Sequence, residues 1–207
     1  RIGDASRGDT IWGCSGARVA LDWVLTTATC LRQSGAAPST TGGAPLKPLT
    51  VETSRALTVA LHPSRDVALI RTEGTLKDVN GTRVLPLATA IPAAGEQFAA
   101  SGYGRTSTSW VPMWRSRVDV LAGEVTDAAV VLSPSGAGGL CKGDAGGPVF
   151  RTVGDKPQLV GLIGDASQGG CYGAPAGEDR SATAIRVDNL GPWIRGWTLD
   201  SGFEPTD

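Results

Sequence analysis

The sequence predicts an all-β protein, either a closed barrel or a sandwich, with one short helix near its end. Glycine (29 residues) and proline (13 residues) are spread through the 207 residues and divide them into short apolar runs. Several runs alternate apolar with polar residues or are rich in β-branched residues, as strands are. Frequent turns between short strands are typical of barrels and sandwiches, and closure removes strand edges that could aggregate.

Nine apolar runs are expected to form strands, in this order: 17–21, 23–25, 57–61, 67–70, 97–100, 118–121, 129–132, 159–163 and 182–187. The segment 34–48, rich in Gly, Ala, Ser and Thr, is expected to be a surface loop. Residues 87–97 are rich in alanine and proline and form a candidate linker between two halves.

A helical pattern occurs only near the end, in residues 188–197. It places four apolar side chains on one helical face: Leu190, Trp193, Ile194 and Trp197. Asp188 or Asn189 is expected to cap the start of this helix.

Composition excludes several classes of partner. The chain is 41% hydrophobic, and a chain of this length buries roughly 70% of its unfolded surface. Its net charge is −1 and no long run of one sign occurs, so we expect no nucleic-acid partner and no polybasic membrane surface. No stretch approaches the ~20 apolar residues of a membrane-spanning helix, so we expect no membrane association.

Four cysteines allow three disulfide pairings. There is no Cys-x-x-Cys spacing and only one histidine, so a zinc site is not expected. We expect neither a metal ion nor a cofactor. Two interpretations remain open here: disulfides in an oxidising, extracellular setting, or buried thiols in a cytosolic protein.

Several segments, in one consistent order, resemble the motifs of a known family. They are Cys14-Ser15-Gly16-Ala17, Leu25-Thr26-Thr27-Ala28-Thr29-Cys30, Asp66-Val67-Ala68-Leu69-Ile70, Gly102-Tyr103-Gly104-Arg105-Thr106, Cys141-Lys142-Gly143-Asp144-Ala145-Gly146-Gly147-Pro148 and Leu159-Val160-Gly161-Leu162-Ile163. Together they resemble the chymotrypsin/trypsin-like serine proteases over nearly the whole chain. The wording of 102–106 and 168–171 is most similar to secreted actinobacterial members.

The resemblance implies an all-β fold of two Greek-key antiparallel β-barrels with a C-terminal helix. Residues 1–90 would form the first barrel, and residues 91–207 the second barrel with the helix, as one unit with a cleft between the barrels. It also implies two disulfides, Cys14–Cys30 and Cys141–Cys171, and therefore a secreted protein.

The catalytic machinery of this family is a serine activated by a histidine that a buried aspartate orients. The resemblance places the aspartate at Asp66, the base at Thr29 and the nucleophile at Ala145. A methyl group cannot attack a carbonyl, and a threonine hydroxyl is not a useful base near neutral pH. We therefore expect no proteolysis, because the triad acts as one unit. We also expect the Thr29 hydroxyl to hydrogen-bond the Asp66 carboxylate, and the single histidine, His62, to have a structural or surface role.

The backbone of the nucleophile loop is expected to survive these substitutions. Gly143, Asp144 and Ala145 would still form an oxyanion loop, since its donors are amides. Such amides can bind a carboxylate or a carbonyl oxygen without reacting.

The resemblance also places a specificity pocket beside this loop. Gly139 stands at its floor, where an acidic residue would select Lys or Arg, and Gly164 and Asp165 stand in its wall. Lys142 lies at its rim. These four residues are possible ligand contacts.

The first residues, Arg1-Ile2-Gly3, resemble the activation junction of the family. Cleavage there would free an Ile2 ammonium to pair with Asp144. With Arg1 attached, Asp144 needs another partner.

Three functional hypotheses follow. The first is a secreted binding or regulatory module that holds an unknown peptide, protein or small-molecule ligand in the former substrate cleft. The second is an enzyme that runs a non-proteolytic reaction on a small molecule with Asp66, Thr29, Lys142 and the oxyanion loop. The third is a protease inactivated by engineering.

Two observations would separate the first two hypotheses. An enclosed apolar pocket around Asp66 and Lys142 favours an enzyme. An exposed aromatic patch favours a partner surface. Trp110 and Trp114 are candidates for such a patch, although core packing is the favoured interpretation for both.

Overall fold

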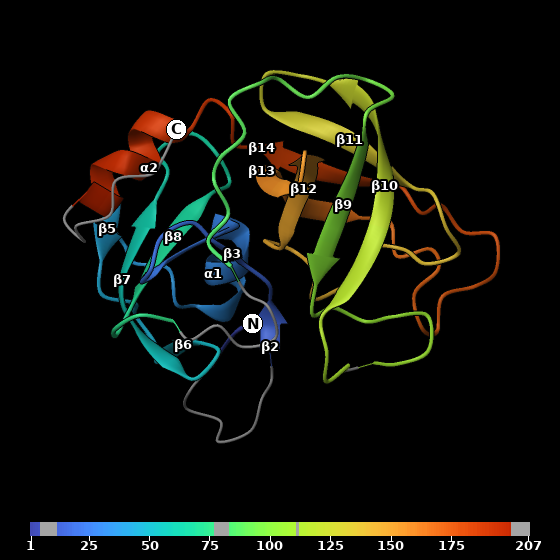
Figure 1. Ribbon diagram of the computed structural model, residues 1–207. Helices are drawn as coiled ribbons and strands as arrows, with labels where there is room; N and C mark the ends of the chain where they lie inside the picture. The colour runs from blue at the N-terminus through green and yellow to red at the C-terminus, as the bar shows by residue number, and fades with distance from the viewer. Residues whose placement is uncertain (5–11, 77–82, 111, 200–207) are drawn as a thin grey trace.

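The computed structural model describes residues 1–4, 12–76, 83–110 and 112–199 and confirms the predicted fold class. The described chain consists of two antiparallel β-sheets and two short helices (Figure 1). The second sheet is a closed barrel of six strands, whereas the first is an open half-barrel in its hydrogen bonding. Within the described residues, no helix is both long enough and apolar enough to cross a membrane.

The first sheet contains eight strands, which pair in the order β2-β1-β6-β7-β8-β4-β3, with β5 also pairing with β7. Their bounds are β1 (Ile2–Asp4), β2 (Trp12–Cys14), β3 (Ala17–Arg18), β4 (Trp23–Thr26), β5 (Gly42–Gly43), β6 (Leu49–Val51), β7 (Ser54–Leu61) and β8 (Ala68–Thr72). The short helix α1 (Ala28–Ser34) follows β4 directly.

The second barrel closes in the order β10-β11-β14-β13-β12-β9. Its strands are β9 (Gln97–Gly102), β10 (Ser116–Val125), β11 (Ala129–Pro134), β12 (Pro148–Val153), β13 (Lys156–Ala166) and β14 (Ala182–Arg186). Strand β11 pairs with β14 instead of its successor β12, which is a Greek-key connection.

Each of the nine predicted apolar runs overlaps a strand. The strands without such a run are β1, β2, β5, β6 and β12; four of them have three residues or fewer, too few to show alternation. Helix α1 was not predicted, because its seven residues include a β-branched threonine and span only two turns. The Thr27 side chain caps its start and Gly35, with a φ of +72°, ends it. The expected loop 34–48 contains the two-residue strand β5.

The predicted terminal helix exists as α2 (Gly191–Thr198). Of its predicted apolar face, Leu190 and Ile194 are buried and Trp193 and Trp197 are partly buried against the same core. The predicted cap is wrong, because Leu190 occupies the cap position without a side-chain hydrogen bond. Asp188 instead binds the Arg186 guanidinium at 2.7 Å, and Asn189 donates to a backbone carbonyl. Pro192 in the first turn has no amide hydrogen to satisfy.

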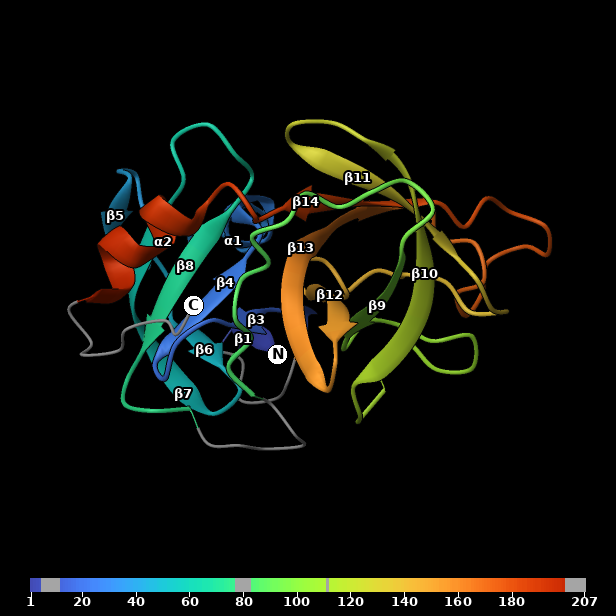
Figure 2. The ribbon, with the colours of Figure 1, turned by 45° about the horizontal axis from the view of Figure 1, so that its top comes forward.

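The two halves share one of the three apolar cores. Leu159 and Leu162 of β13 pack in the same cluster as Leu25 of β4 and Leu69 of β8. Figures 1 and 2 show α2 beside the first sheet, although it follows the second barrel in sequence. The approach is close, since a Cβ at Gly42 would lie 2.5 Å from the Trp197 ring. The proposed boundary between residues 90 and 91 lies in the connection from β8 to β9 and stays a prediction.

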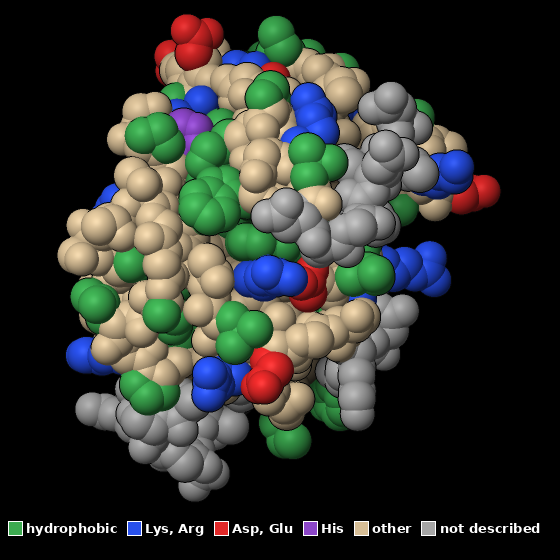
Figure 3. Space-filling model, turned by 90° about the vertical axis from the view of Figure 1, so that its left-hand side faces the viewer, with side chains coloured by type: hydrophobic (Ala, Val, Ile, Leu, Met, Phe, Trp, Pro, Cys, Tyr) green, Lys and Arg blue, Asp and Glu red, His purple; other side chains and the backbone are tan. Residues whose placement is uncertain are grey.

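One sequence-based expectation is corrected by the structure. Trp110 and Trp114 are not core residues, because 58% and 67% of their surfaces are exposed. Ile2, which follows Arg1, lies inside β1, is 2% exposed and pairs with Val51 and Cys14. On the face that includes the first sheet, basic and acidic side chains are interspersed (Figure 3).

Candidate functional site

The site lies where the connections of the first sheet meet those of the second barrel. Asp66 precedes β8 in a tight turn that starts at His62. The His62 amide donates to the carbonyl of Val67 at 2.9 Å, and its Nδ1 accepts from the amides of Ser64 and Arg65. Its ring packs edge-on against another aromatic ring, that of Trp193, at 4.9 Å. The structural role predicted for His62 is confirmed.

Arg65 fastens this turn to the second barrel. Its guanidinium donates to the carbonyls of Ala128 at 2.7 Å and Arg186 at 3.1 Å. Ala128 directly precedes β11, and Arg186 is the last residue of β14. The backbone that carries Asp66 is therefore fixed relative to both halves of the molecule.

Asp66 and Thr29 are in contact, but not as the sequence suggested. The backbone amide of Thr29, in the first turn of α1, donates to Asp66 Oδ1 at 2.6 Å. The Arg32 guanidinium lies 3.5 Å from the same oxygen, and 37% of the Asp66 side chain is exposed. The predicted hydrogen bond from the Thr29 hydroxyl to a buried Asp66 carboxylate is wrong. The carboxylate is partly exposed, and its Oδ1 is satisfied by the Thr29 backbone amide and the Arg32 guanidinium.

The nucleophile loop, residues 141–147, is tightly turned. The Asp144 amide donates to the carbonyl of Cys141, and the Gly146 amide donates to that of Ile163. Gly143 has a φ of +102°, which a residue with a side chain rarely adopts. Among the described residues, no acceptor receives the amides of Gly143 or Ala145. These are the two donors that an oxyanion loop would offer.

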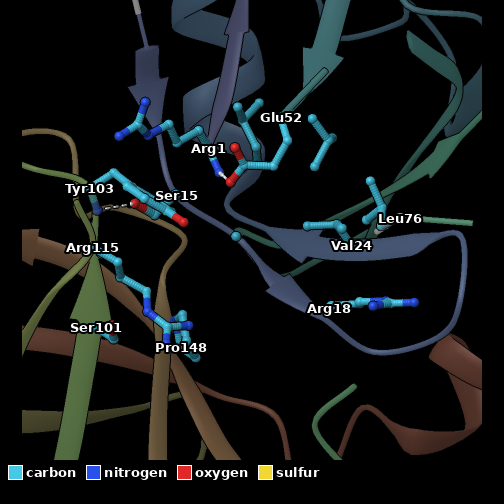
Figure 4. A pocket seen from close by; sticks show the side chains of 14 residues that line it. Arg1, Ser15, Arg18, Val24, Glu52, Leu76, Ser101, Tyr103, Arg115 and Pro148 are labelled. Carbon is cyan, nitrogen blue, oxygen red and sulfur yellow. Dashed lines mark hydrogen bonds and ion pairs between the residues drawn. The ribbon is translucent and has the colours of Figure 1, made fainter. Parts of the chain in front are cut away.

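Ser15 connects this loop to both halves of the molecule. Its hydroxyl donates to the carbonyl of Gly143 at 2.8 Å and accepts from the amide of Tyr103 at 2.9 Å. Its own amide donates to the carbonyl of Ala145 at 2.9 Å. Figure 4 shows Ser15 and Tyr103 side by side at the seam between the halves. Ser15 is 1% exposed, so these bonds are shielded from water.

Asp144 is the buried anchor of the loop, with 1% of its surface exposed. Its carboxylate accepts hydrogen bonds of 2.8 Å from the amides of Gly104 and Cys141. No ion pair joins it to a lysine or arginine in the part of the chain that the structure describes. The partner that Asp144 needs is therefore the backbone.

Burial raises the pKa of Asp144 to about 6, and the two amide bonds offset only part of this effect. The two glycines of the 102–106 motif make the burial possible. A Cβ at Gly102 would lie 2.2 Å from Asp144 Oδ1, and one at Gly104 would lie 2.6 Å from the Asp144 amide nitrogen.

Gln168 bridges two segments that the resemblance places at the rim and the wall of the expected specificity pocket. The side-chain carbonyl of Gln168 accepts from the Lys142 amide at 2.8 Å, and its side-chain amide donates to the carbonyl of Ala166 at 3.0 Å. Gln168 has a φ of +69°, a left-handed conformation that costs such a residue about 1–2 kcal/mol. These two hydrogen bonds hold Gln168 in this unfavourable backbone conformation.

The floor of the expected pocket is filled by backbone. Gly139 is buried, and a Cβ there would lie 2.1 Å from the carbonyl oxygen of Gly169. This leaves Gly139 without the open space that a ligand contact needs. The disulfide Cys141–Cys171 ties the two segments together beside it.

The other possible ligand contacts are accessible. Lys142 and Asp165 are exposed, and Gly164 is half-buried at the end of β13. The Asp165 amide donates to Thr183 Oγ1 at 3.3 Å, which fixes this wall to β14. The roles of these three residues in binding a ligand stay predictions.

A small cavity, of about 40 Å³, lies at the seam between the halves. It lies beside Ser15 and Tyr103, with Val24 and Glu52 on its other side (Figure 4). Such a volume holds about one water molecule. In the described part of the chain, no three His, Cys, Asp or Glu side chains gather closely enough to hold a metal ion.

Sequence reasoning missed Ser15 and Gln168. Ser15 contacts Gly143 across 128 positions of sequence, and a single serine in a strand connection carries no signal for such a bond. Gln168 was noticed only as part of a family-like segment. Its positive φ could not be inferred, because glutamine does not favour that conformation.

Both predicted disulfides are present, Cys14–Cys30 and Cys141–Cys171, and the structure contains no free cysteine. Two disulfides fit an oxidising, extracellular setting. A comparison with protein-family models matches residues 4–194 to the trypsin family. The chain therefore belongs to the trypsin family, and the resemblance of its separate motifs is confirmed at the level of the family.

The pKa of Asp144 predicts an unusual pH dependence of stability. The folded state binds this proton more tightly than the unfolded state, whose carboxyl titrates near 3.8. The stabilisation is complete below pH 4 and is lost as pH rises through about 6, on the order of 3 kcal/mol. Relative to Asp144→Asn, the parent protein should lose unfolding free energy between pH 4 and 7 in denaturant titrations. Asp155 is exposed, so Asp155→Asn should keep the pH profile of the parent's unfolding free energy. A difference in unfolding free energy between the parent and Asp144→Asn that does not change with pH would contradict a raised pKa of Asp144.

Replacing Gln168 by glycine should remove the side-chain bridge beside the expected pocket at little cost in stability. The variant loses hydrogen bonds worth about 1 kcal/mol each but relieves the positive φ, worth about 1–2 kcal/mol. Amide hydrogen exchange at Lys142 should accelerate by about tenfold or more as its acceptor disappears. Gln168→Glu keeps that acceptor and should leave Lys142 protected. Equal exchange rates of the Lys142 amide in the parent and in Gln168→Gly would show that the Gln168 side chain does not protect this amide.

Proposed function

We propose that this chain is a secreted member of the trypsin family that binds a peptide or protein segment in the former substrate cleft without cleaving it. The observation that carries the proposal is the combination at Ala145. Around this methyl group the loop keeps its tight turn, its buried Asp144 anchor and two amides free to donate. A loop in this state can hold a carbonyl or carboxylate oxygen but offers no nucleophile to attack a peptide.

The environment of Thr29 supports the same conclusion. Thr29 stands where the family places its base, and its amide already occupies Asp66 Oδ1. Arg32 neutralises part of the remaining charge. Asp66 is thus satisfied as a structural acceptor, and no imidazole is at hand to take a proton from an attacking group.

A reaction on a small molecule is less well supported. Such chemistry needs an enclosed site that excludes water. The Asp66 side chain is 37% exposed and Lys142 is exposed. Gln168 bridges the segments beside the expected pocket, and Gly139 lies against backbone. Exposed residues of this kind suit an extended chain segment better than a small molecule that needs enclosure.

Placement near the secreted actinobacterial members of the family remains part of this proposal. It is supported by the wording of residues 102–106 and 168–171 and by the two disulfides. No partner from nucleic acid or membrane is expected.

Restoring the base and the nucleophile tests whether the remaining geometry of the site can still support catalysis. The variant with Thr29→His and Ala145→Ser should hydrolyse a small activated ester about 10²-fold faster than the parent, because a positioned base typically contributes that much or more. Each single substitution should remain near the parent rate, since the groups act as a unit. The parent should show only background hydrolysis. Parent activity that Asp66→Asn abolishes would show instead that the native site is catalytic.

A further inference from the structure

Four large side chains on two joined connections are exposed, and they are here called the aromatic surface. Trp110 and Tyr172, from the β9–β10 and β13–β14 connections, are in ring contact, and Met113 and Trp114 lie further along the β9–β10 connection. Their exposed fractions are 58%, 76%, 67% and 42%. Side chains of this size are seldom left in water without a partner, because each buries 150–250 Å² when covered.

Two side chains of this surface, Trp110 and Tyr172, are held in place before any partner arrives. The Arg105 guanidinium stacks over Trp110 at 4.2 Å, and the Trp110 and Tyr172 rings meet edge to face at 5.9 Å. The Tyr172 amide donates to the carbonyl of Thr106 at 2.7 Å, which joins the two connections. A surface that is already ordered loses little conformational entropy on binding.

The charges closest to Trp110 are basic. Arg105 and Lys142 form no ion pair within the described residues, and residues 103–115 contain no aspartate or glutamate. An exposed glutamate, Glu178, lines a neighbouring hollow together with Arg180. Asp144, in the adjoining loop, is buried. The complement of unpaired cations beside tryptophans is a segment that carries carboxylates together with apolar side chains.

The aromatic surface is continuous with the cleft. The Arg105 amide donates to the carbonyl of Lys142 at 3.1 Å, so the β9–β10 connection abuts the oxyanion loop. A hollow of about 450 Å³ opens on the other side, lined by small residues such as Ala174 and Pro175 and by Ser107. It offers room for an apolar side chain of a segment that passes over Tyr172.

We propose that the aromatic surface binds an acidic segment of a partner protein whose carboxylates alternate with apolar side chains. This inference rests on the proposed function, since it names the class of partner that the cleft would hold. Tryptophan, tyrosine, methionine and arginine are the residue types enriched at protein interfaces, and tryptophan, tyrosine and arginine dominate their binding energy.

A fluorescein-labelled decapeptide that alternates glutamate with leucine and phenylalanine tests this proposal. Fluorescence polarisation should show saturable binding to the intact chain. Trp110→Ala, Trp114→Ala and Arg105→Glu should each weaken it by about tenfold or more. Binding should also weaken at high ionic strength, where exposed charges are screened. Ile91→Ala and Lys156→Glu alter an exposed apolar and an exposed basic residue outside this surface, and should bind as the parent does.

Three outcomes of the binding experiment would overturn the proposal of an acidic partner segment. The same peptide with lysine in place of glutamate should not bind; equal affinity would show that charge plays no part. Absence of binding at millimolar peptide, or binding only to vesicles of phosphatidylcholine and phosphatidylserine in a manner that needs Trp110, would also refute it. Mass analysis of the peptide separates this proposal from the preceding one, because cleavage of a bound peptide would refute the proposed function but not the surface.

Discussion

The burial of the Asp144 carboxylate beneath two glycines is the constraint on which the site depends. Gly102 and Gly104 leave the space that the side chain fills, and hydrogen bonds from the amides of Gly104 and Cys141 offset part of its lost hydration. This arrangement turns the nucleophile loop so that Gly143 takes its positive φ, and Ser15 then fastens the loop to the first half. None of these contacts involves the side chain at position 145. The loop therefore keeps its shape whether or not a nucleophile is present, which is why a family scaffold can persist around Ala145.

The same logic accounts for the rest of the cleft. Asp66 is held by the turn that His62 closes and by Arg65, which reaches across to the second barrel. Its charge is met by an amide and by Arg32, so the position does not need a histidine to be stable. Gln168, in a left-handed backbone conformation, bridges to the Lys142 amide beside the expected pocket. What we propose as open to a partner is the pair of free amides at Gly143 and Ala145 and the aromatic surface.

Much of this fold could be predicted from the sequence, and the exceptions have physical causes. Strand alternation and the helical spacing of Leu190, Ile194 and Trp197 are local signals, and they identified most strands and α2. The helix cap was wrong because Asp188 is used by Arg186, a partner that sequence proximity alone does not reveal. Trp110 was expected in the core because apolar character does not distinguish a core residue from an interface residue. The loop motif drew attention to Gly143, which has a positive φ, and to Asp144, which is buried. The bond from Ser15 to the carbonyl of Gly143 spans 128 positions, and no local sequence signal reveals it.

The central claim is that no group in the groove can form a covalent bond with a carbonyl-like electrophile. Intact-mass analysis of the unmodified protein after incubation with an active-site-directed fluorophosphonate tests it most directly. The account predicts that the mass stays unchanged. A stoichiometric adduct, mapped by peptide digestion to a residue that lines the groove, would contradict it.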